Sequence, residues 1–427
     1  MKILCISNGH GEDIIALQIL KSLQKADPTV AISALSIVGE GHAYRQVNIP
    51  VVGPTKTLAS GGFLYMDSQQ LVRDIKSGLI SLTLGQLRAI KRWVTTEAGC
   101  ILAVGDIVPL LLAWWSGAPY AFIGTAKSEY HLRDEQGPLQ RENWWDQQES
   151  AAASVYFPWE RWLMARRRCR AVFPRDRITT ERLLRWPIQA FDLGNPMMDD
   201  LMPTPACLAA KATHLETSGR SHKPLTVTLL PGSRPPEVYK NWQIILTACT
   251  CLVDADATQP LRFLAAITPS LDLRAFESCL AQAGWQPANT PLPVLHEGET
   301  YVTYTREAAV LALISDAYAD CLHQANLGIA MAGTATEQLV GLGKPVITLP
   351  GQGPQFTPTF AQAQSRLLGC SIVHVEDAKM LPGVVKDLMG DRERLDQIQA
   401  NGLKRMGRPG AARRIADRLL EVFEDEQ

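Results

Sequence analysis

Short apolar runs, each ending in a small-residue turn that leads into a helical pattern, recur in both halves of the chain. In the first half, Lys2–Ser7 is followed by Asn8–Asp13 and then by apolar residues at helical spacing. In the second half, Leu225–Leu230 is followed by Pro231–Arg234 and a helical pattern over Val238–Val253. Strands that alternate with helices form parallel sheets with helices on both faces. The sequence therefore predicts an α/β fold with a doubly wound parallel sheet in each half.

The length of the chain, 427 residues, exceeds what one ordinary core holds, because domains cluster at about 100 to 200 residues. Residues 199–223 mix proline, serine, threonine, glycine and charged residues, as linkers do. We expect an N-terminal Rossmann-like domain over residues 1–198, a linker over 199–223, a second Rossmann-like domain over 224–390 and C-terminal helices over 391–427.

Further elements follow the same alternating pattern. We expect further strands over residues 31–38, near 50–52, and over 100–104, 120–124, 171–174, 190–193, 263–267, 327–331 and 345–349. We expect helices over residues 68–96, 158–170 and 179–185. Residues 107–126 carry no charge and are long enough for a bilayer, but Pro109 and the Ser116–Pro119 break divide them into a helix and a strand. The polar stretch 129–153 is expected to be a loop or an insertion.

Composition narrows the choice of partners and compartment. Apolar residues make up 46% of the chain and the net charge is −1, so we expect no nucleic-acid partner. The nine cysteines are scattered, without the spacing of a zinc site. The apolar run Ile3–Ile6 is too short for a secretory signal. These features predict a cytoplasmic protein with reduced thiols and no bound metal.

The loop after Leu230 is the first candidate site, because open α/β sheets bind ligands beyond the carboxyl ends of their strands. Gly232 and Ser233 would present backbone N–H groups at a helix start, and Arg234 would add a guanidinium. Both groups bind phosphate oxygens. The alternative is an ordinary turn with an arginine that faces solvent.

The second candidate follows the apolar run that ends at Met331. Gly333, Thr334, Ala335 and Thr336 let a ligand approach the backbone, and Glu337 lies one turn into the helix, where its carboxylate can accept from ribose hydroxyls. The alternative is a capping box between Thr334 and Glu337. Two phosphate-competent loops in one half favour a nucleotide diphosphate.

Catalytic candidates lie in the first half of the chain. His10, with Glu12 beside it, follows the first strand and is a candidate general base, although a loop histidine is often only solvated. Asp106 lies at the tip of an apolar strand and could deprotonate an acceptor hydroxyl, or it could be a structural cap at the strand end. The Asn8–Asp13 loop lacks both the dinucleotide glycine pattern and the P-loop lysine.

An aromatic and basic segment, 157–170, is the last candidate. Its alternation of apolar and arginine residues is typical of a helix that lies on an anionic membrane or holds a phosphorylated lipid, and the alternative is an ordinary amphipathic helix. Lys127 could also contact an acceptor phosphate. The residues of 157–170 that we assign to the acceptor or membrane are Trp159, Trp162, Arg166, Arg167 and Arg168.

Three motifs together resemble the lipid-A-disaccharide synthase family, and more closely the synthase-related proteins of cyanobacteria and plastids. They are Leu193–Asp200, Leu229–Arg234 with Glu237 after it, and Gly333–Glu337, and they stand in the family's order. Weaker similarities are found at Gly11–Asp13, Asp106 and Phe356–Phe360. The resemblance spreads over nearly the whole chain.

The resemblance implies a GT-B fold, with two Rossmann-like domains facing each other across a cleft and a C-terminal helix that returns to the N-terminal domain. It implies an acceptor-binding N-terminal domain, a C-terminal domain that binds a UDP-sugar, and inverting sugar transfer without a metal or other cofactor. Helix N-termini and Arg234 would stabilise the donor diphosphate. By motif match, Glu337 would hold the ribose and Asp106 would be the candidate base.

Two departures from the family leave the acceptor open. The family's opening Gly-Glu-Ala-Ser-Gly-Asp is replaced by Asn8–Asp13, and the polar insertion over 127–153 has no clear counterpart in the synthase. The acceptor could be another glycolipid, a carotenoid glycoside precursor or a polyprenyl carrier, met at the inner face of a membrane. A UDP-N-acetylhexosamine 2-epimerase and a catalytically degenerate scaffold that binds nucleotide sugar or lipid are the alternatives. Oligomeric state stays open, with a homodimer as one option.

Overall fold

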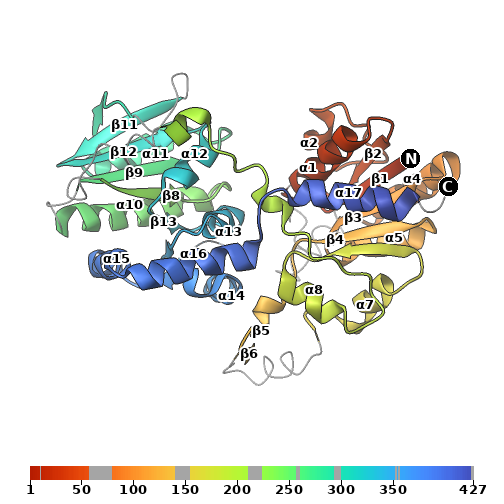
Figure 1. Cartoon of the computed structure of the whole chain (residues 1–427). Coiled ribbons are helices and arrows are strands. Elements are labelled where there is room, and N and C mark those ends of the chain that lie inside the picture. The colour runs from red at the N-terminus through yellow and green to blue at the C-terminus, as the bar shows by residue number, and fades with distance from the viewer. Residues whose placement is uncertain are drawn as a thin grey trace. The chain divides into compact units, whose positions relative to one another are not determined.

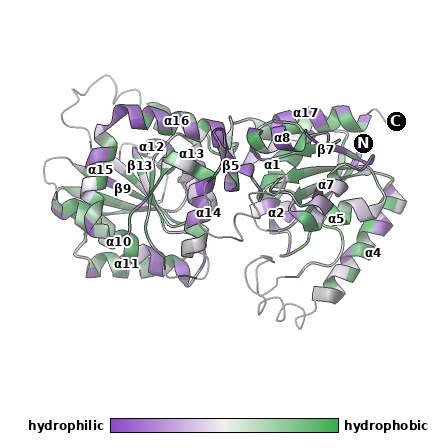
Figure 2. Ribbon diagram, turned by 90° about the horizontal axis from the view of Figure 1, so that it is seen from below, coloured by the Kyte–Doolittle hydropathy of each residue, from purple (hydrophilic) through white to green (hydrophobic). Residues whose placement is uncertain are grey.

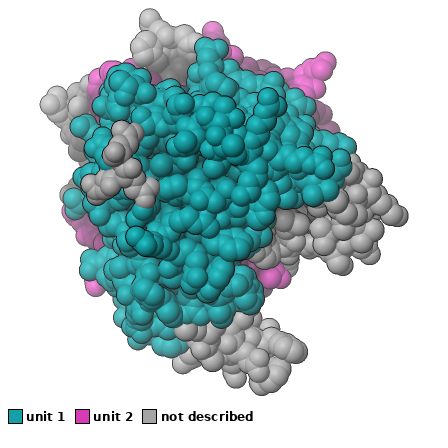
Figure 3. Space-filling view, turned by 90° about the vertical axis from the view of Figure 1, so that its right-hand side faces the viewer, with its two compact units in different colours: residues 1–199, 408–427 teal, residues 200–407 magenta. Residues whose placement is uncertain are grey.

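The computed structural model divides the chain into two compact units (Figure 1). Unit 1 comprises Met1–Asp199 and Arg408–Gln427, and unit 2 comprises Asp200–Gly407 (Figure 3). The structure describes residues 1–9, 11–56, 79–139, 154–209, 224–255, 260–292, 300–351, 353 and 356–424. Within this part of the chain, no helix is long and apolar enough to cross a membrane.

Unit 1 is built on a parallel sheet with the strand order β2-β1-β3-β4-β7. In chain order these strands are β1 (Lys2–Ser7), β2 (Ala31–Ser36), β3 (Cys100–Gly105), β4 (Tyr120–Gly124) and β7 (Cys169–Phe173). The helices of the unit include α1 (Gly11–Ala26), α2 (His42–Arg45), α4 (Leu79–Glu97), α5 (Ile107–Ser116), α7 (Pro158–Met164) and α8 (Arg177–Leu183). A short hairpin of β5 (Arg133–Asp134) and β6 (Gly137–Pro138) stands apart from the sheet. Helices cover both faces, so the strand residues are almost all buried.

Three expectations for unit 1 are wrong in detail. The strands expected near 50–52 and over 190–193 are reduced to single bridges, Ala34 with Val51 and Val172 with Ala190. The helix expected over 158–170 ends at Met164. It ends there because β7 begins at Cys169 and pairs with β4, and the chain needs a turn to enter that strand. Arg166, Arg167 and Arg168 therefore lie in a turn and not on a helix.

Unit 2 is built on a sheet with the order β10-β11-β12-β9-β8-β13-β14-β15 in the described residues. Its strands are β8 (Leu225–Leu230), β9 (Leu261–Ala266), β10 (Gln286–Ala288), β11 (Tyr301–Arg306), β12 (Ala309–Ile314), β13 (Leu327–Ala330), β14 (Val346–Thr348) and β15 (Ile372–His374). Its helices include α10 (Glu237–Ala255), α11 (Leu273–Gln282), α12 (Tyr318–Gln324), α13 (Thr334–Gly341), α14 (Pro358–Leu368), α15 (Leu381–Gly390) and α16 (Arg392–Met406). Strands β12, β9, β8, β13, β14 and β15 are parallel, as expected for β9, β8, β13 and β14, whereas β15 was not among the expected strands. Strands β10 and β11 add an antiparallel edge next to β12, which was not expected either.

Hydrophobic residues gather on the strands of both sheets, and the covering helices carry polar residues as well (Figure 2). The core of unit 2 centres on Trp242, Phe263, Phe276 and Trp285, all almost fully buried. Each unit thus has its own hydrophobic core.

The chain returns to unit 1 through its last helix, α17 (Ala411–Glu424), which packs on α1 (Figure 1). Asp199 fixes the start of this helix. Its Oδ1 accepts from the backbone N–H of Gly410 at 2.6 Å and of Ala411 at 3.0 Å, and its Oδ2 accepts from that of Ala412 at 2.5 Å. The return of a C-terminal helix to the N-terminal unit is confirmed.

Candidate functional site

The two phosphate-competent loops of unit 2 lie side by side. Strands β8 and β13 are parallel neighbours in which Leu230 pairs with Ala330, and the N–H of Met331 donates to the carbonyl of Leu230 at 2.9 Å. Because parallel strands share one carboxyl edge, the loop at 231–234 and the loop at 331–333 leave the sheet together. Helices α10 and α13 begin directly after them.

The first loop presents the predicted residues at the start of α10. Gly232 has a φ of 101°, a conformation that glycine adopts without strain. Ser233 is exposed and Arg234 is half-buried, and the Arg234 carbonyl accepts from the N–H of Val238 in the first turn of α10 at 3.0 Å. Backbone N–H groups of Gly232 and Ser233 and the guanidinium of Arg234 are therefore placed on one loop, which leads through Pro235 and Pro236 into α10.

The capping box between Thr334 and Glu337, which was the alternative for the second loop, is wrong. The N-cap of α13 is Gly333, and no side chain caps the helix there, because Thr334 is already its first residue. Thr334 is exposed and Glu337 is half-buried in the first turn. Thr336, by contrast, is buried, and its hydroxyl donates to the carbonyl of Ala332 at 2.7 Å. Thr336 thus supports the loop from inside, and Thr334, Ala335 and Glu337 remain accessible.

Two buried amides hold the second loop in place. Asn241 of α10, 2% exposed, donates through Nδ2 to the carbonyl of Pro231 at 3.0 Å and to that of Met331 at 3.2 Å. Gln364 of α14, 4% exposed, donates through Nε2 to Ala332 at 3.0 Å and to Gly333 at 3.4 Å. The sequence analysis missed both residues, which no local motif marks.

Glu237 joins a third loop, the one after β14, to the carboxyl edge of the sheet from which the loops after β8 and β13 leave. This carboxylate is buried and accepts from the backbone N–H of Phe356 at 2.7 Å. Its position leaves no room for a side chain at Gly353. Glu237, which the family resemblance singled out, therefore ties the start of α10 to the loop before α14.

In unit 1, the loop after β1 rests on a buried polar cluster. Asp13 accepts from the hydroxyls of Ser7 at 2.5 Å and Ser36 at 2.9 Å, and the hydroxyl of Tyr44 lies 2.7 Å from that of Ser7. Burial raises the pKa of Tyr44 well above its usual value, and it also raises that of the Cys5 thiol. The cluster is a support for the loop, since Asp13 has both carboxylate oxygens engaged.

Two of the candidate bases, Glu12 and Asp106, follow the neighbouring strands β1 and β3 of unit 1. Glu12 is half-buried and its N–H donates to the carbonyl of Gly9 at 3.1 Å. His10 lies outside the described residues. Asp106 caps α5 by accepting from the N–H of Val108 at 2.9 Å, as its structural alternative predicts. A side chain at Gly105 would meet Asn8, so the loops after β1 and β3 are in contact.

The ammonium group of Lys127 contacts two residues of unit 1, Glu160 and Phe157. Its ammonium lies 2.6 Å from Glu160, which is 2% exposed, and 4.5 Å from the centre of the Phe157 ring. Glu160 also accepts from the backbone N–H of Phe157 at 2.8 Å. Lys127 therefore balances a buried carboxylate at the start of α7.

Exposed aromatic residues on α5 and α7 form one surface with a set of cations, which we call the aromatic-basic face. Trp162 packs edge-on against Trp114 at 5.4 Å, and Arg166 lies 4.1 Å from the Trp162 ring. Arg168 donates to the carbonyl of Trp114 at 3.1 Å. The face comprises Leu111, Trp115, Phe157, Trp159 and Trp162, with Lys91, Arg166, Arg167 and Arg168.

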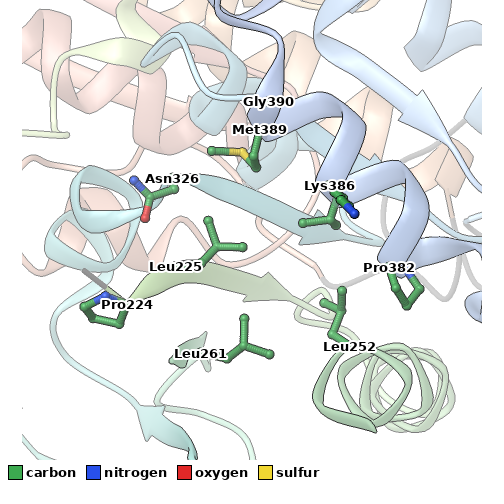
Figure 4. Close-up of a pocket in the computed structure, with 10 residues that line it drawn as sticks. Pro224, Leu225, Leu252, Leu261, Asn326, Pro382, Lys386, Met389 and Gly390 are labelled. Atoms are coloured by element: carbon green, nitrogen blue, oxygen red, sulfur yellow. The ribbon is translucent and has the colours of Figure 1, made fainter. Parts of the chain in front are cut away.

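A cavity of about 390 Å³ in unit 2 lies away from the loops that follow β8 and β13 (Figure 4). Leu225 and Leu261 line it, and each is the first residue of its strand. The cavity therefore opens at the amino edge of the sheet, opposite the edge that carries Gly232 and Gly333. Among the residues that the structure describes, no group of three or more histidine, cysteine, aspartate or glutamate residues is arranged to hold a metal.

Several solved structures share this architecture. MurG from Acinetobacter baumannii aligns over 98% of this chain and 99% of its own, with 13% identity and a TM-score of 0.57. The calicheamicin glycosyltransferase CalG4 aligns over 100% and 98%, with 12% identity and a TM-score of 0.58. The UDP-GlcNAc 2-epimerase from Neisseria meningitidis, solved with UDP-GlcNAc bound, aligns over 99% and 100%, with 14% identity and a TM-score of 0.54.

These similarities confirm the predicted fold class, two Rossmann-like α/β units of the GT-B type. No protein-family model and no curated protein matches the sequence. The resemblance to the lipid-A-disaccharide synthase family therefore stays a prediction that rests on the three motifs.

Proposed function

We propose that this chain is a UDP-sugar-dependent glycosyltransferase that transfers a hexose or N-acetylhexosamine to a lipid or membrane-associated acceptor, in the manner of lipid-A-disaccharide synthase. The observation that carries the proposal is the pairing of two loops on neighbouring strands of unit 2. Gly232, Ser233 and Arg234 lie on the loop that precedes α10, and Thr334 and Glu337 lie in the first turn of α13.

This pairing suits a nucleotide diphosphate. The N-terminus of a helix carries about half a positive charge, so the starts of α10 and α13, together with Arg234 on the loop before α10, would hold a diphosphate without a metal. Glu337, one turn into α13, would accept from the ribose hydroxyls. The same groups would stabilise the charge that develops on UDP as it leaves.

The transfer would proceed in one displacement. A base in unit 1, with Asp106, Glu12 and His10 as candidates, would take the proton of the acceptor hydroxyl while its oxygen bonds to the anomeric carbon. The bond from that carbon to UDP breaks on the opposite face, and UDP leaves with the electron pair. Configuration is therefore inverted.

Calorimetric titration with UDP, UDP-glucose and UDP-N-acetylglucosamine, with and without EDTA, tests the donor site. We expect binding that EDTA does not change, and Arg234→Ala should weaken it between about tenfold and 100-fold, because hydrogen bonds to charged groups contribute about 1.5–3 kcal/mol. Arg274→Ala is the control, since Arg274 is an exposed arginine of the same unit that pairs with Asp272. Equal UDP affinity in both variants would contradict the proposal.

The aromatic-basic face supports an acceptor at a membrane surface. Tryptophans among arginines suit the interface of an anionic bilayer, where each cation contributes about 1 kcal/mol. Trp159 is 58% exposed and Trp162 is 46% exposed, values unusual for tryptophan in a folded domain. The face lies on the unit to which the resemblance assigns the acceptor.

Vesicle flotation tests this face. We expect the protein to float with vesicles rich in phosphatidylglycerol, and changing Arg166, Arg167 and Arg168 to Glu should reduce binding more than about 100-fold, since at least three favourable interactions are reversed. The control changes three exposed arginines elsewhere to Glu and so alters the net charge equally. These control positions are Arg274, Arg392 and Arg413. Equal loss in the control would mean that net charge alone governs binding.

A second candidate is a UDP-N-acetylhexosamine 2-epimerase, because one of the similar structures has that activity by name and the same architecture. Incubation with UDP-N-acetylglucosamine and no acceptor separates the two. Appearance of the 2-epimer would favour the epimerase. Tight UDP binding with no turnover on a broad acceptor panel would instead favour a degenerate scaffold.

A further inference from the structure

Asn241 and Gln364 share an unusual arrangement at the carboxyl edge of unit 2. Each uses one amide nitrogen to donate to two loop carbonyls, Pro231 and Met331 for Asn241, Ala332 and Gly333 for Gln364. In each, the amide oxygen is buried and has no hydrogen-bond partner among the described residues. Neither residue was predicted to touch the nucleotide.

The donated bonds set the distance between the loops. Asn241 is the shared donor between the loop after β8 and the loop after β13, and Gln364 joins the second of these loops to α14. Without the amide nitrogens, the carbonyls of Pro231 and Met331 would lose the donor that lies between them. The two helix starts would then be free to shift, although a diphosphate needs its donors within about 0.5 Å of their places.

The orphaned oxygens argue against a purely structural role. Burying a carbonyl oxygen without a partner costs stability, and most buried polar atoms in folded proteins avoid it. A leucine of nearly the same shape as Asn241 would remove the unpaired oxygen, but it would leave the carbonyls of Pro231 and Met331 without their shared donor. The cost of the unpaired oxygen therefore accompanies the bonds that join the two loops.

We infer that Asn241 and Gln364 are positioning residues, which hold the loops after β8 and β13 at the spacing that one diphosphate requires. They would act through the backbone of Gly232, Ser233 and Gly333, without contacting the ligand. This inference rests on the proposed UDP-sugar site. It adds that the two amides affect binding of the diphosphate and not of the nucleoside.

The experiment compares UDP and uridine on Asn241→Leu and Gln364→Leu, by calorimetry well below the unfolding temperature of each variant. Both variants remove the donors and keep the volume. We expect UDP binding to weaken about tenfold or more while uridine binding changes less than twofold, since the diphosphate spans both loops whereas the ribose is held by Glu337 of α13 alone. The ratio of the two affinities is a readout that a general loss of stability does not move.

Asn326→Leu is the matched control. Asn326 joins the same two strands at their other end, where its Oδ1 accepts from the N–H of Thr226 at 2.8 Å. This variant should leave the ratio of UDP to uridine affinity unchanged. If the wild type binds UDP and both test variants keep its ratio, the inference is wrong and the proposed function stands. If the wild type binds neither ligand, the proposed function itself fails. If one of the two test variants does not fold, the ratio of UDP to uridine affinity in the other variant tests the inference.

Discussion

Replacing Asp199 by alanine tests how much the hydrogen bonds between Asp199 and the start of α17 stabilise unit 1. The carboxylate accepts from three successive N–H groups at the start of α17, those of Gly410, Ala411 and Ala412. Losing an N-cap side chain costs about 0.5–2 kcal/mol, and losing a negative charge at a helix start about 0.3–1 kcal/mol more. We therefore expect Asp199→Ala to lower the free energy of unfolding of unit 1 by about 1–3 kcal/mol.

For a unit of roughly 200 residues, that loss lowers the midpoint of thermal unfolding by about 2–12 °C. Asp199→Asn keeps one acceptor oxygen and should lose about half as much. Scanning calorimetry gives the midpoint, and hydrogen exchange read by mass spectrometry locates the change. Amides of residues 411–424 and of α1 should exchange faster, while those of unit 2 stay as they are.

Asp417→Ala is the control for this experiment. Asp417 lies on the same helix, carries the same charge and makes only a long 3.9 Å ion pair with Arg413 at the surface. Its removal should change the midpoint by less than about 1 °C. An equal effect of both variants, or unchanged exchange of α17 in Asp199→Ala, would refute the capping role.

Three further predictions follow from single sites. Lys127→Ala leaves the buried carboxylate of Glu160 without its cation and should destabilise unit 1 by about 3 kcal/mol in urea unfolding, whereas the double variant Lys127→Met with Glu160→Gln should recover most of the loss. Glu337→Ala should weaken UDP binding about tenfold in calorimetry and leave phosphate binding unchanged, because the lost bond is to the ribose. Burial raises the pKa of Asp176 above 3.8, so the folded state binds this proton more tightly than the unfolded state. The stability tied to that proton is lost as the pH rises from 3.8 through the raised pKa. Asp176→Asn, which keeps the acceptor for the N–H of Thr179, should flatten the pH dependence of urea-unfolding stability above pH 3.8.

Much of the fold was accessible from the sequence. The predicted strand Leu225–Leu230 matches β8 residue for residue, because a central parallel strand buried on both faces leaves an unbroken apolar run that ends in a turn. The hairpin of β11 and β12 was missed for a physical reason. Its turn contains Glu307 at a φ of 50°, where glycine or asparagine would have marked the turn.

The site was accessible only in part. Gly232 and Gly333 stand in local motifs, and the sequence placed both on loops that the structure brings together. Asn241 and Gln364 have no such mark, since their partners lie up to 90 residues away and depend on how strands pair. The capping box failed because α13 begins one residue earlier than the box requires, at Thr334.

The hydrogen bonds between Asp199 and α17 also affect the order in which the two units can finish folding during synthesis. Unit 1 is complete only when its last segment has left the ribosome, whereas every residue of unit 2 is synthesised earlier. Until then the buried side of α1 lacks its cover, because Ile415, Leu419 and Phe423 of α17 are buried in the finished unit. A chain that stops before Arg408 would therefore hold a finished second unit beside an open first one, with an apolar helix face exposed to chaperones and proteases.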